Sequence, residues 1–209
     1  MKIIDNYRDL TIGMYLDICE VDKREDIDEV MKQVIILSYL TGMAEDDILN
    51  LPISEYRELA TKSHFLSHPY NGEIQMAKKY TIGKWELYPV TDFQKITAAQ
   101  YIDFQTFAKE GEKRIVEIIS ILLIPKGKKY NQDYDIVELQ NDLRQALSVA
   151  DALTLFAFFF VQYRALIKDS LTYCREVAME IPDKDKRMKT LRMIQEQEDL
   201  LTSGVGLRM

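Results

Sequence analysis

The sequence predicts a mainly α-helical fold, a helical bundle made of two related helical units with a small β-hairpin between them. Apolar residues recur with helical spacing along most of the chain, and three short segments of its first half return in the same order in its second half. One stretch, residues 79–88, is instead aromatic and β-branched around a glycine. With 209 residues, of which 47% are apolar, the chain is long enough to bury a substantial core.

The internal repeat is indicated by the order and the content of these segments. The first pair places threonine and tyrosine at matching positions, Thr11 and Tyr15 in one copy and Thr97 and Tyr101 in the other. The second pair is an apolar run that holds one serine, and the third begins and ends with leucine. The pairs are residues 10–17 with 96–103, 34–40 with 116–122, and 51–59 with 147–155. Duplicated helical units without reactive clusters typically serve packing and partner binding.

The repeat divides the chain into four predicted parts. Residues 1–68 form the first helical unit, and residues 92–168 form the second. Between the two units, residues 69–91 form a linker that contains the β-hairpin. Residues 169–209 form a C-terminal helical extension and tail.

The first unit is expected to contain a series of short helices. Thr11 precedes the first helix, where its hydroxyl can cap free backbone amides. Residues 26–41 have apolar side chains at helical spacing, and Gly42 is a natural stop for that helix. A short helix begins near Ala44, because the acids that follow it favour a first helical turn. Pro52 starts or precedes one more helix.

The middle of the chain changes its pattern before the second unit begins. Residues 83–84 are the expected turn of the hairpin, and Trp85 is expected to attach the hairpin to a helix. Residues 115–124 could be a strand by propensity alone, but the alignment with the first unit favours a helix that ends at Pro125. The helix that starts near Ser148 is apolar nearly all round, which indicates a central helix or an oligomer contact.

The C-terminal extension contains the candidate partner-binding residues. Residues 171–181 continue the helical pattern until Pro182, and residues 185–201 form a charged amphipathic helix. Its sparse apolar stripe comprises Met188, Leu191, Ile194 and Leu201. We predict that this stripe contacts a partner, because an amphipathic helix can lie in an apolar groove of another protein. Internal packing is the alternative interpretation of the same stripe. The last residues, 202–209, are expected to form a loose tail.

Charge and hydropathy bear on the partners that the chain can have. Its formal net charge is −7, which disfavours nucleic-acid binding because the protein would repel phosphate. The longest uncharged apolar run, residues 152–161, is too short for a membrane span, which needs about 20 residues. We therefore expect neither a nucleic acid nor a membrane as a partner. Cys19 and Cys174 match no metal-binding spacing and are expected to be reduced, semi-buried thiols.

Reactive side chains do not converge anywhere in the sequence. His64 and His68 have the spacing of helical zinc ligands, but Pro69 follows them and no further Cys or His could readily complete the shell. Nucleophile motifs and glycine-rich phosphate loops are missing, and the clusters of carboxylates are typical of solvated helix faces. The sequence predicts no catalytic residue, no cofactor site and no metal site, and hence a protein that is not an enzyme.

Three segments together resemble small phage morphogenesis proteins. Residues 9–17 read Asp-Leu-Thr-Ile-Gly-Met-Tyr-Leu-Asp, residues 36–42 read Ile-Leu-Ser-Tyr-Leu-Thr-Gly, and residues 46–56 read Asp-Asp-Ile-Leu-Asn-Leu-Pro-Ile-Ser-Glu-Tyr. This pattern is similar to the tail assembly chaperones of long-tailed bacteriophages, which begin with a Leu-Thr-x-Gly-x-Tyr helix and continue into an acidic helical segment. The hairpin and residues 95–105 also resemble uncharacterised proteins in the structural gene blocks of gut Bacteroidetes phages, crAss-like phages among them.

The resemblance spans residues 9–167 and implies a non-enzymatic protein that acts by protein–protein contact. It would be a virion structural protein of the tail, neck or ring, or a tail assembly chaperone. The implied partners are other phage structural or tail proteins and further copies of the chain, in the host cytoplasm during assembly and, for a structural subunit, in the virion. The chain departs from the chaperone pattern because it is doubled, carries a hairpin and has a long C-terminal extension. A cellular helical adaptor or regulatory module, and an enzyme or small-molecule binder, are the alternatives.

Overall fold

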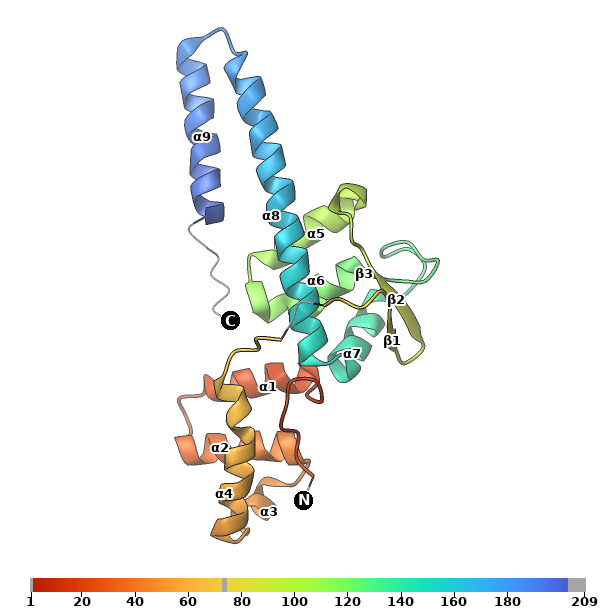
Figure 1. Cartoon of the computed structure of the whole chain (residues 1–209), viewed down its shortest axis with the longest axis vertical. Helices are drawn as coiled ribbons and strands as arrows, with labels where there is room; N and C mark the ends of the chain where they lie inside the picture. The colour runs from red at the N-terminus through yellow and green to blue at the C-terminus, as the bar shows by residue number, and fades with distance from the viewer. Residues whose placement is uncertain (1, 73–74, 203–209) are drawn as a thin grey trace.

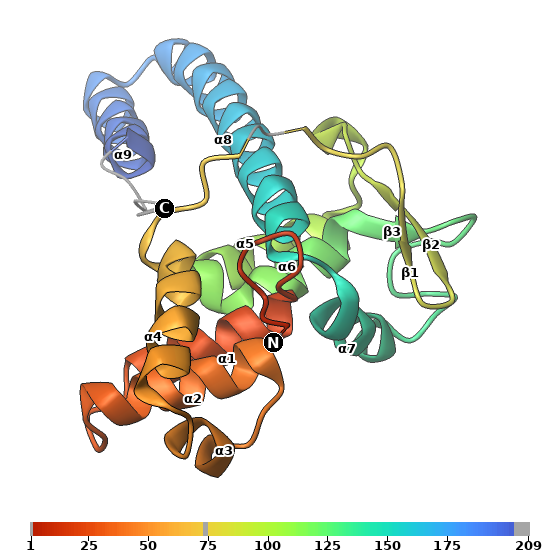
Figure 2. The same ribbon diagram turned by 60° about the horizontal axis from the view of Figure 1, so that its bottom comes forward.

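The computed structural model describes residues 2–72 and 75–202, together with the side chains of all of these except residues 112 and 197–202. The molecule is elongated, and three parts follow one another along its long axis (Figure 1). A unit of four helices forms one end, a helical core with a small sheet forms the middle, and a pair of long helices forms the other end. Figure 2 shows the same three parts from another side.

The order of the elements confirms that the fold is mainly helical. The helices of the first end are α1 (Ile12–Asp22), α2 (Glu29–Thr41), α3 (Glu45–Leu49), α4 (Ile53–Lys62) and the 3-10 turn η1 (Ser63–Ser67). The middle contains β1 (Tyr80–Ile82), β2 (Trp85–Pro89), η2 (Phe93–Lys95), α5 (Ala98–Ala108), η3 (Gly111–Arg114), α6 (Ile115–Leu122), β3 (Leu123–Pro125) and α7 (Ile136–Ala146). The two long helices are α8 (Val149–Met179) and α9 (Lys184–Thr202).

The helices of the first end begin and stop where the sequence predicts. The Thr11 hydroxyl accepts a hydrogen bond from the backbone amide of Met14, as expected for the cap of α1. Asp28 caps α2 in the same way, and Gly42 ends that helix in the left-handed conformation, at a φ of 72°. A small apolar core under α2, α3 and α4 contains the buried side chains Val34, Leu37, Ile48 and Leu59.

The predicted hairpin is confirmed, and it extends into a three-stranded antiparallel sheet. Strands β1 and β2 are joined by a two-residue turn in which Gly83 has a positive φ, and Ile82 lies opposite Trp85. The Trp85 indole donates a hydrogen bond of 2.6 Å to Asp142 of α7, so this side chain attaches the hairpin to a helix as predicted. The third strand, β3, was not predicted.

Strand β3 corrects the expectation for residues 115–124. The helical alignment is right up to Leu122, but the last residues before Pro125 leave the helix and pair with β2. Leu123 and Pro125 are buried in this strand, and the backbone amide of Lys126 donates to the carbonyl of Glu86. The apolar, β-branched composition that favours a strand therefore applies to the end of the segment only.

The largest core lies in the middle of the molecule, where α6 and the first half of α8 meet. Every residue of α6 except Glu117 is buried, and α8 contributes the buried rings of Phe156, Phe159 and Phe160. The Phe104 ring of α5 contacts this cluster at a centroid distance of 5.7 Å from Phe160. The prediction of a central helix after Ser148 is confirmed for this half of α8.

The first end is joined to the middle at the beginnings of α1 and α8. The backbone amide of Ile12 donates to Leu147, and the amide of Val149 donates to Leu10, so the capping residues of the two helices face each other. Gly13 lies so close to α7 that a Cβ atom there would be 2.5 Å from the Arg144 carbonyl oxygen. Backbone hydrogen bonds and the close packing of Gly13 on Arg144 therefore hold the first end of the molecule against its middle.

The relation between the two predicted units stays a prediction. Both units have helices in corresponding order at the three matched segments, and Thr97 caps α5 as Thr11 caps α1. They differ between the second and fourth helices, where the first unit has the short α3 and the second has β3 and α7. The predicted boundary after residue 168 falls inside α8, which runs without a break to Met179.

Candidate functional site

The predicted partner-contact stripe lies on α9, which folds back along the second half of α8 as a helical hairpin (Figure 1). We call this hairpin, residues 161–202, the arm. Helix α8 ends before Pro182, which confirms the predicted break. Asp183 then caps α9 by accepting hydrogen bonds from the backbone amides of Asp185 and Lys186, at 2.9 and 3.1 Å. The connection is short, so the two helices must lie antiparallel.

The structure places the four stripe residues in different environments. Ile194 is only 6% exposed, and Leu191 is half-buried, because both lie on the side of α9 that packs against α8. Met188 is 47% exposed. The side chain of Leu201 lies outside the described residues. Internal packing therefore accounts for Ile194 and Leu191 within one chain, whereas Met188 remains available to a partner.

Several apolar side chains that sequence reasoning missed face solvent on the arm, among them Val161 and Met179, each 61% exposed. Tyr173 is 67% exposed and Met193 is 59% exposed, while Val177 is also on the surface. Tyr173 and Val177 are four residues apart and therefore lie on the same face of α8. Predicting a helical hairpin with its turn at Pro182 would have identified these side chains. Apolar residues outside the stripe that packs between the two helices must then face solvent.

The beginning of α9 is strongly basic although the whole chain is acidic. Between residues 184 and 192 there is one acid, Asp185, and there are five bases, which are Lys184, Lys186, Arg187, Lys189 and Arg192. Arg187 donates to the carbonyl of Ile181. In the part of the chain that the structure describes, the other four bases are exposed and form no ion pair. The arm thus combines exposed apolar side chains with a local excess of positive charge at the beginning of α9.

Helix α8 also meets the length and composition of a membrane span. It has 31 residues, and its most apolar 18-residue window has a mean hydropathy of 1.4. However, 44% of that window is buried inside the protein, against α5, α6 and the neighbouring loops. The same composition is typical of the core helix of a globular protein, so the expectation of no membrane partner stays a prediction.

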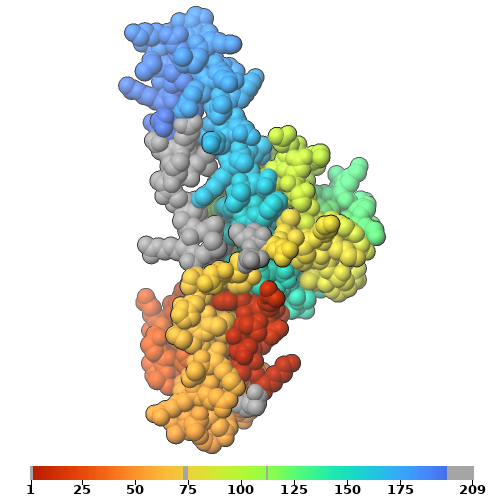
Figure 3. All heavy atoms as spheres, in the orientation of Figure 1, coloured from red at the N-terminus to blue at the C-terminus, as the bar shows by residue number. Residues whose placement is uncertain are grey.

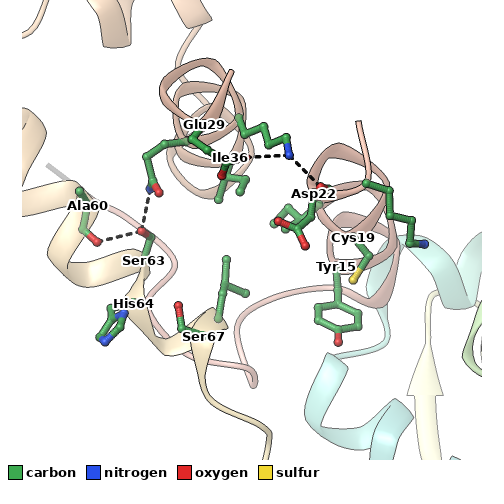
Figure 4. A pocket seen from close by; sticks show the side chains of 14 residues that line it. Tyr15, Cys19, Asp22, Glu29, Ile36, Ala60, Ser63, His64 and Ser67 are labelled. Atoms are coloured by element: carbon green, nitrogen blue, oxygen red, sulfur yellow. Dashed lines mark hydrogen bonds and ion pairs between the residues drawn. The ribbon is translucent and has the colours of Figure 1, made fainter. Parts of the chain in front are cut away.

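A pocket of about 490 Å³ lies between α1, α2 and the end of α4 (Figure 4). Its polar groups bind one another. Lys32 donates to Glu29 at 2.9 Å and to the carbonyl of Asp22, while Gln33 donates to the Ser63 hydroxyl at 3.0 Å. The Ser63 hydroxyl in turn donates to the Ala60 carbonyl. These bonds hold the three helices together.

The chain has two histidines and two cysteines that could take part in chemistry or bind a metal. His64 lies in η1 at the edge of the pocket, and its ring contacts His68 at a centroid distance of 5.0 Å. Among the described residues, no group of three or more His, Cys, Asp or Glu side chains could hold a metal ion. Cys19 is half-buried as expected, but Cys174 is exposed, because α9 does not cover that side of α8.

No family model, no curated protein and no solved structure matches the chain. The function has therefore to be inferred from the surfaces and side chains of the chain itself, and the arm is its most distinctive surface.

Proposed function

We propose that this chain is a non-enzymatic phage assembly or virion structural protein that acts by protein–protein contact. It would be a tail, neck or ring component, or a tail assembly chaperone. The resemblance of residues 9–17, 36–42 and 46–56 to phage morphogenesis proteins supports the phage context. The partners proposed are other phage structural or tail proteins and further copies of the chain.

The observation that carries the proposal is the arm. It projects beyond the body of the molecule (Figure 3), and it presents Tyr173, Val177, Met188 and Met193 to solvent together with exposed lysines that form no ion pair with any described residue. Burying exposed apolar area stabilises a complex by about 25 cal/mol per Å² before the costs of association. Aromatic and methionine side chains are enriched in protein interfaces, which fits this composition.

The pocket between α1, α2 and α4 supports an enzyme less well than the arm supports a binding protein. Of its polar side chains, Lys32 donates to the Asp22 carbonyl of α1 and Gln33 donates to Ser63, so both are engaged in bonds that join α2 to its neighbours. A general base must instead be free to reach a proton on a substrate.

Quantitative mass spectrometry of purified particles and of the lysate from the same infected culture tests the proposal. Recovery in particles at a fixed ratio to a known structural protein would identify a structural subunit. Abundance in the lysate with absence from particles, together with loss of particles when the gene is deleted, would identify a chaperone. Particle yield that does not change on deletion, with no chain in the particles, would contradict both and favour a cellular adaptor.

A further inference from the structure

The charge of the chain is divided unevenly along its length. Residues 1–68 contain 14 acidic and 7 basic residues, which gives a formal charge of −7. Residues 69–209 contain 20 of each and are neutral overall. All of the excess negative charge therefore belongs to the first helical unit, while the beginning of α9 is a local concentration of positive charge.

The first unit also exposes apolar side chains beside its acids. Asp46 and Asp47 are exposed in the first turn of α3, and neither forms an ion pair with any described residue. Leu49, at the end of α3, is 54% exposed, and Ile53, at the start of α4, is 66% exposed. This surface, which we call the acidic end, is complementary in charge to the beginning of α9 and, like the arm, exposes apolar side chains.

The acidic end and the basic part of the arm lie at opposite ends of the molecule. In Figures 1 and 3, α3 and α4 are at the bottom, and the turn between α8 and α9 is at the top. The core of α5, α6 and α7 lies between them and is joined to both. One chain cannot bring its own two complementary surfaces together, so only a second molecule can join them.

We propose that the arm of one chain docks on the acidic end of a second copy, so that the chains assemble head to tail. The inference rests on the proposed function, since it names a partner for the arm. Two different surfaces meet in such a contact, and repeated head-to-tail contacts produce a closed ring or an open helical filament. Lys186 and Lys189 face Asp46 and Asp47 of the next copy, while Met193, which lies seven residues after Lys186 on the same face of α9, covers Leu49 and Ile53.

The charges orient the two copies, and the apolar side chains supply the contact area. Complementary charges accelerate encounter and fix orientation more than they add affinity. Because these charges are exposed, salt screens them over about 10 Å at 0.1 M and about 3 Å at 1 M. The assembly is therefore expected to weaken as the salt concentration rises.

Sedimentation velocity of the full chain at several concentrations and two salt concentrations provides the first test. We expect species larger than the 24.4 kDa monomer at low salt and a shift towards the monomer at 1 M salt. A monomer at every concentration at low salt would overturn the proposal. It would leave the proposed function intact if the chain is still recovered from particles.

Charge reversal identifies the two surfaces. Lys186→Glu with Lys189→Glu changes the arm, and Asp46→Lys with Asp47→Lys changes the acidic end. Each double variant is expected to raise the dissociation constant about five- to tenfold, because attraction between the two surfaces is replaced by repulsion. The matched control is Lys128→Glu with Lys129→Glu, which makes the same charge change in an exposed loop. Circular dichroism melting curves verify that every variant is folded.

Mixing the two variants tests whether the arm of one copy meets the acidic end of another, and sedimentation of the mixture separates a dimer from a longer head-to-tail assembly. In the mixture, the acidic arm of one variant meets the basic end of the other, and the unchanged arm meets the unchanged end. We expect the mixture to assemble although neither variant does so alone. Continued dissociation of the mixture, or an equal effect of the loop control, would overturn the proposal.

Discussion

The two halves of α8 both carry aromatic and apolar side chains, but they have different surroundings. In the first half, Phe156 and Phe159 are buried under α5, α6 and η2. In the second half, Tyr173 and Val177 face solvent, because only α9 lies beside that part of the helix. A single helix thus carries a core at one end and an unpartnered face at the other. An apolar side chain contributes to folding or to binding according to which elements cover it.

Truncation of one aromatic ring in each half of α8 tests this difference in surroundings with the largest expected effect. Phe159→Ala is expected to lower the free energy of unfolding by about 3–5 kcal/mol, because it removes a fully buried ring and leaves a cavity. Tyr173→Ala is expected to change it by less than about 0.5 kcal/mol, since that ring is largely in water. Urea denaturation of both variants measures the difference. Equal losses would show that the arm is buried in the folded monomer.

The junction between the first unit and the core is the next most sensitive position. Gly13→Ala places a methyl group 2.5 Å from the Arg144 carbonyl oxygen, so α1 must move away from α7. We expect a loss of about 1–3 kcal/mol in the free energy of unfolding. Ser54→Ala is the control, because Ser54 also lies in the first turn of a helix but is exposed. A Gly13 variant as stable as the control would contradict the close contact of α1 with α7.

A polar contact in the core should cost less than either packing change. The Tyr130 hydroxyl donates to Asp103 at 2.8 Å, and its burial, together with Asp103, raises the pKa of Tyr130. Tyr130→Phe is expected to lower the free energy of unfolding by about 1 kcal/mol at pH 7.

The same contact predicts a dependence on alkaline pH. Because the pKa of Tyr130 is higher in the folded protein than in the unfolded chain, its stabilisation is complete below about pH 10 and is lost as the pH rises further. The wild type should therefore lose more stability above pH 10 than Tyr130→Phe does. Parallel losses in urea denaturation at pH 8 and pH 11 would contradict this assignment.

The smallest expected effect is that of the ion pair across the junction. Arg144 contacts Asp17 at 2.5 Å, and both side chains are nearly half exposed. Arg144→Ala should therefore change the free energy of unfolding by about 0.2–1 kcal/mol, and less at high salt. Arg114→Ala is the comparison, since Arg114 is similarly exposed but its partners, Glu110 and Glu117, lie within four residues of it. A loss above about 2 kcal/mol would mean that the pair is more important than the adjoining packing.

Much of the fold could be predicted because local signals agree with the packing. Thr11, Thr97 and Gly42 act at the helix ends where their chemistry indicates. Strand β3 could not be predicted, since strand propensity extends over all of residues 115–124 and the long-range pairing of Leu123 with Pro89 decides which part leaves the helix. The contact of Asp17 with Arg144 is likewise long-range, and no local pattern predicts it.

The candidate site could be predicted only in part. The amphipathic pattern of α9 is correct, but the pattern does not say what its apolar stripe contacts. The antiparallel position of α8 turns Ile194 inward and leaves Met193 outside. Sequence spacing shows only that Tyr173 belongs to a continuous helix. The exposure of its side chain depends on how far α5 and α6 extend along α8, which the spacing does not show.

Site-specific photo-crosslinking in the producing culture tests whether the arm is a protein-binding surface. A benzophenone amino acid replaces Tyr173 on the arm or, as a control, the equally exposed Val137 on α7. We expect position 173 to form adducts with a second copy of the chain or with an identified phage structural protein, and we expect none from position 137. Adducts confined within one chain, or equally abundant from both positions, would contradict the claim that the arm is a protein-binding surface.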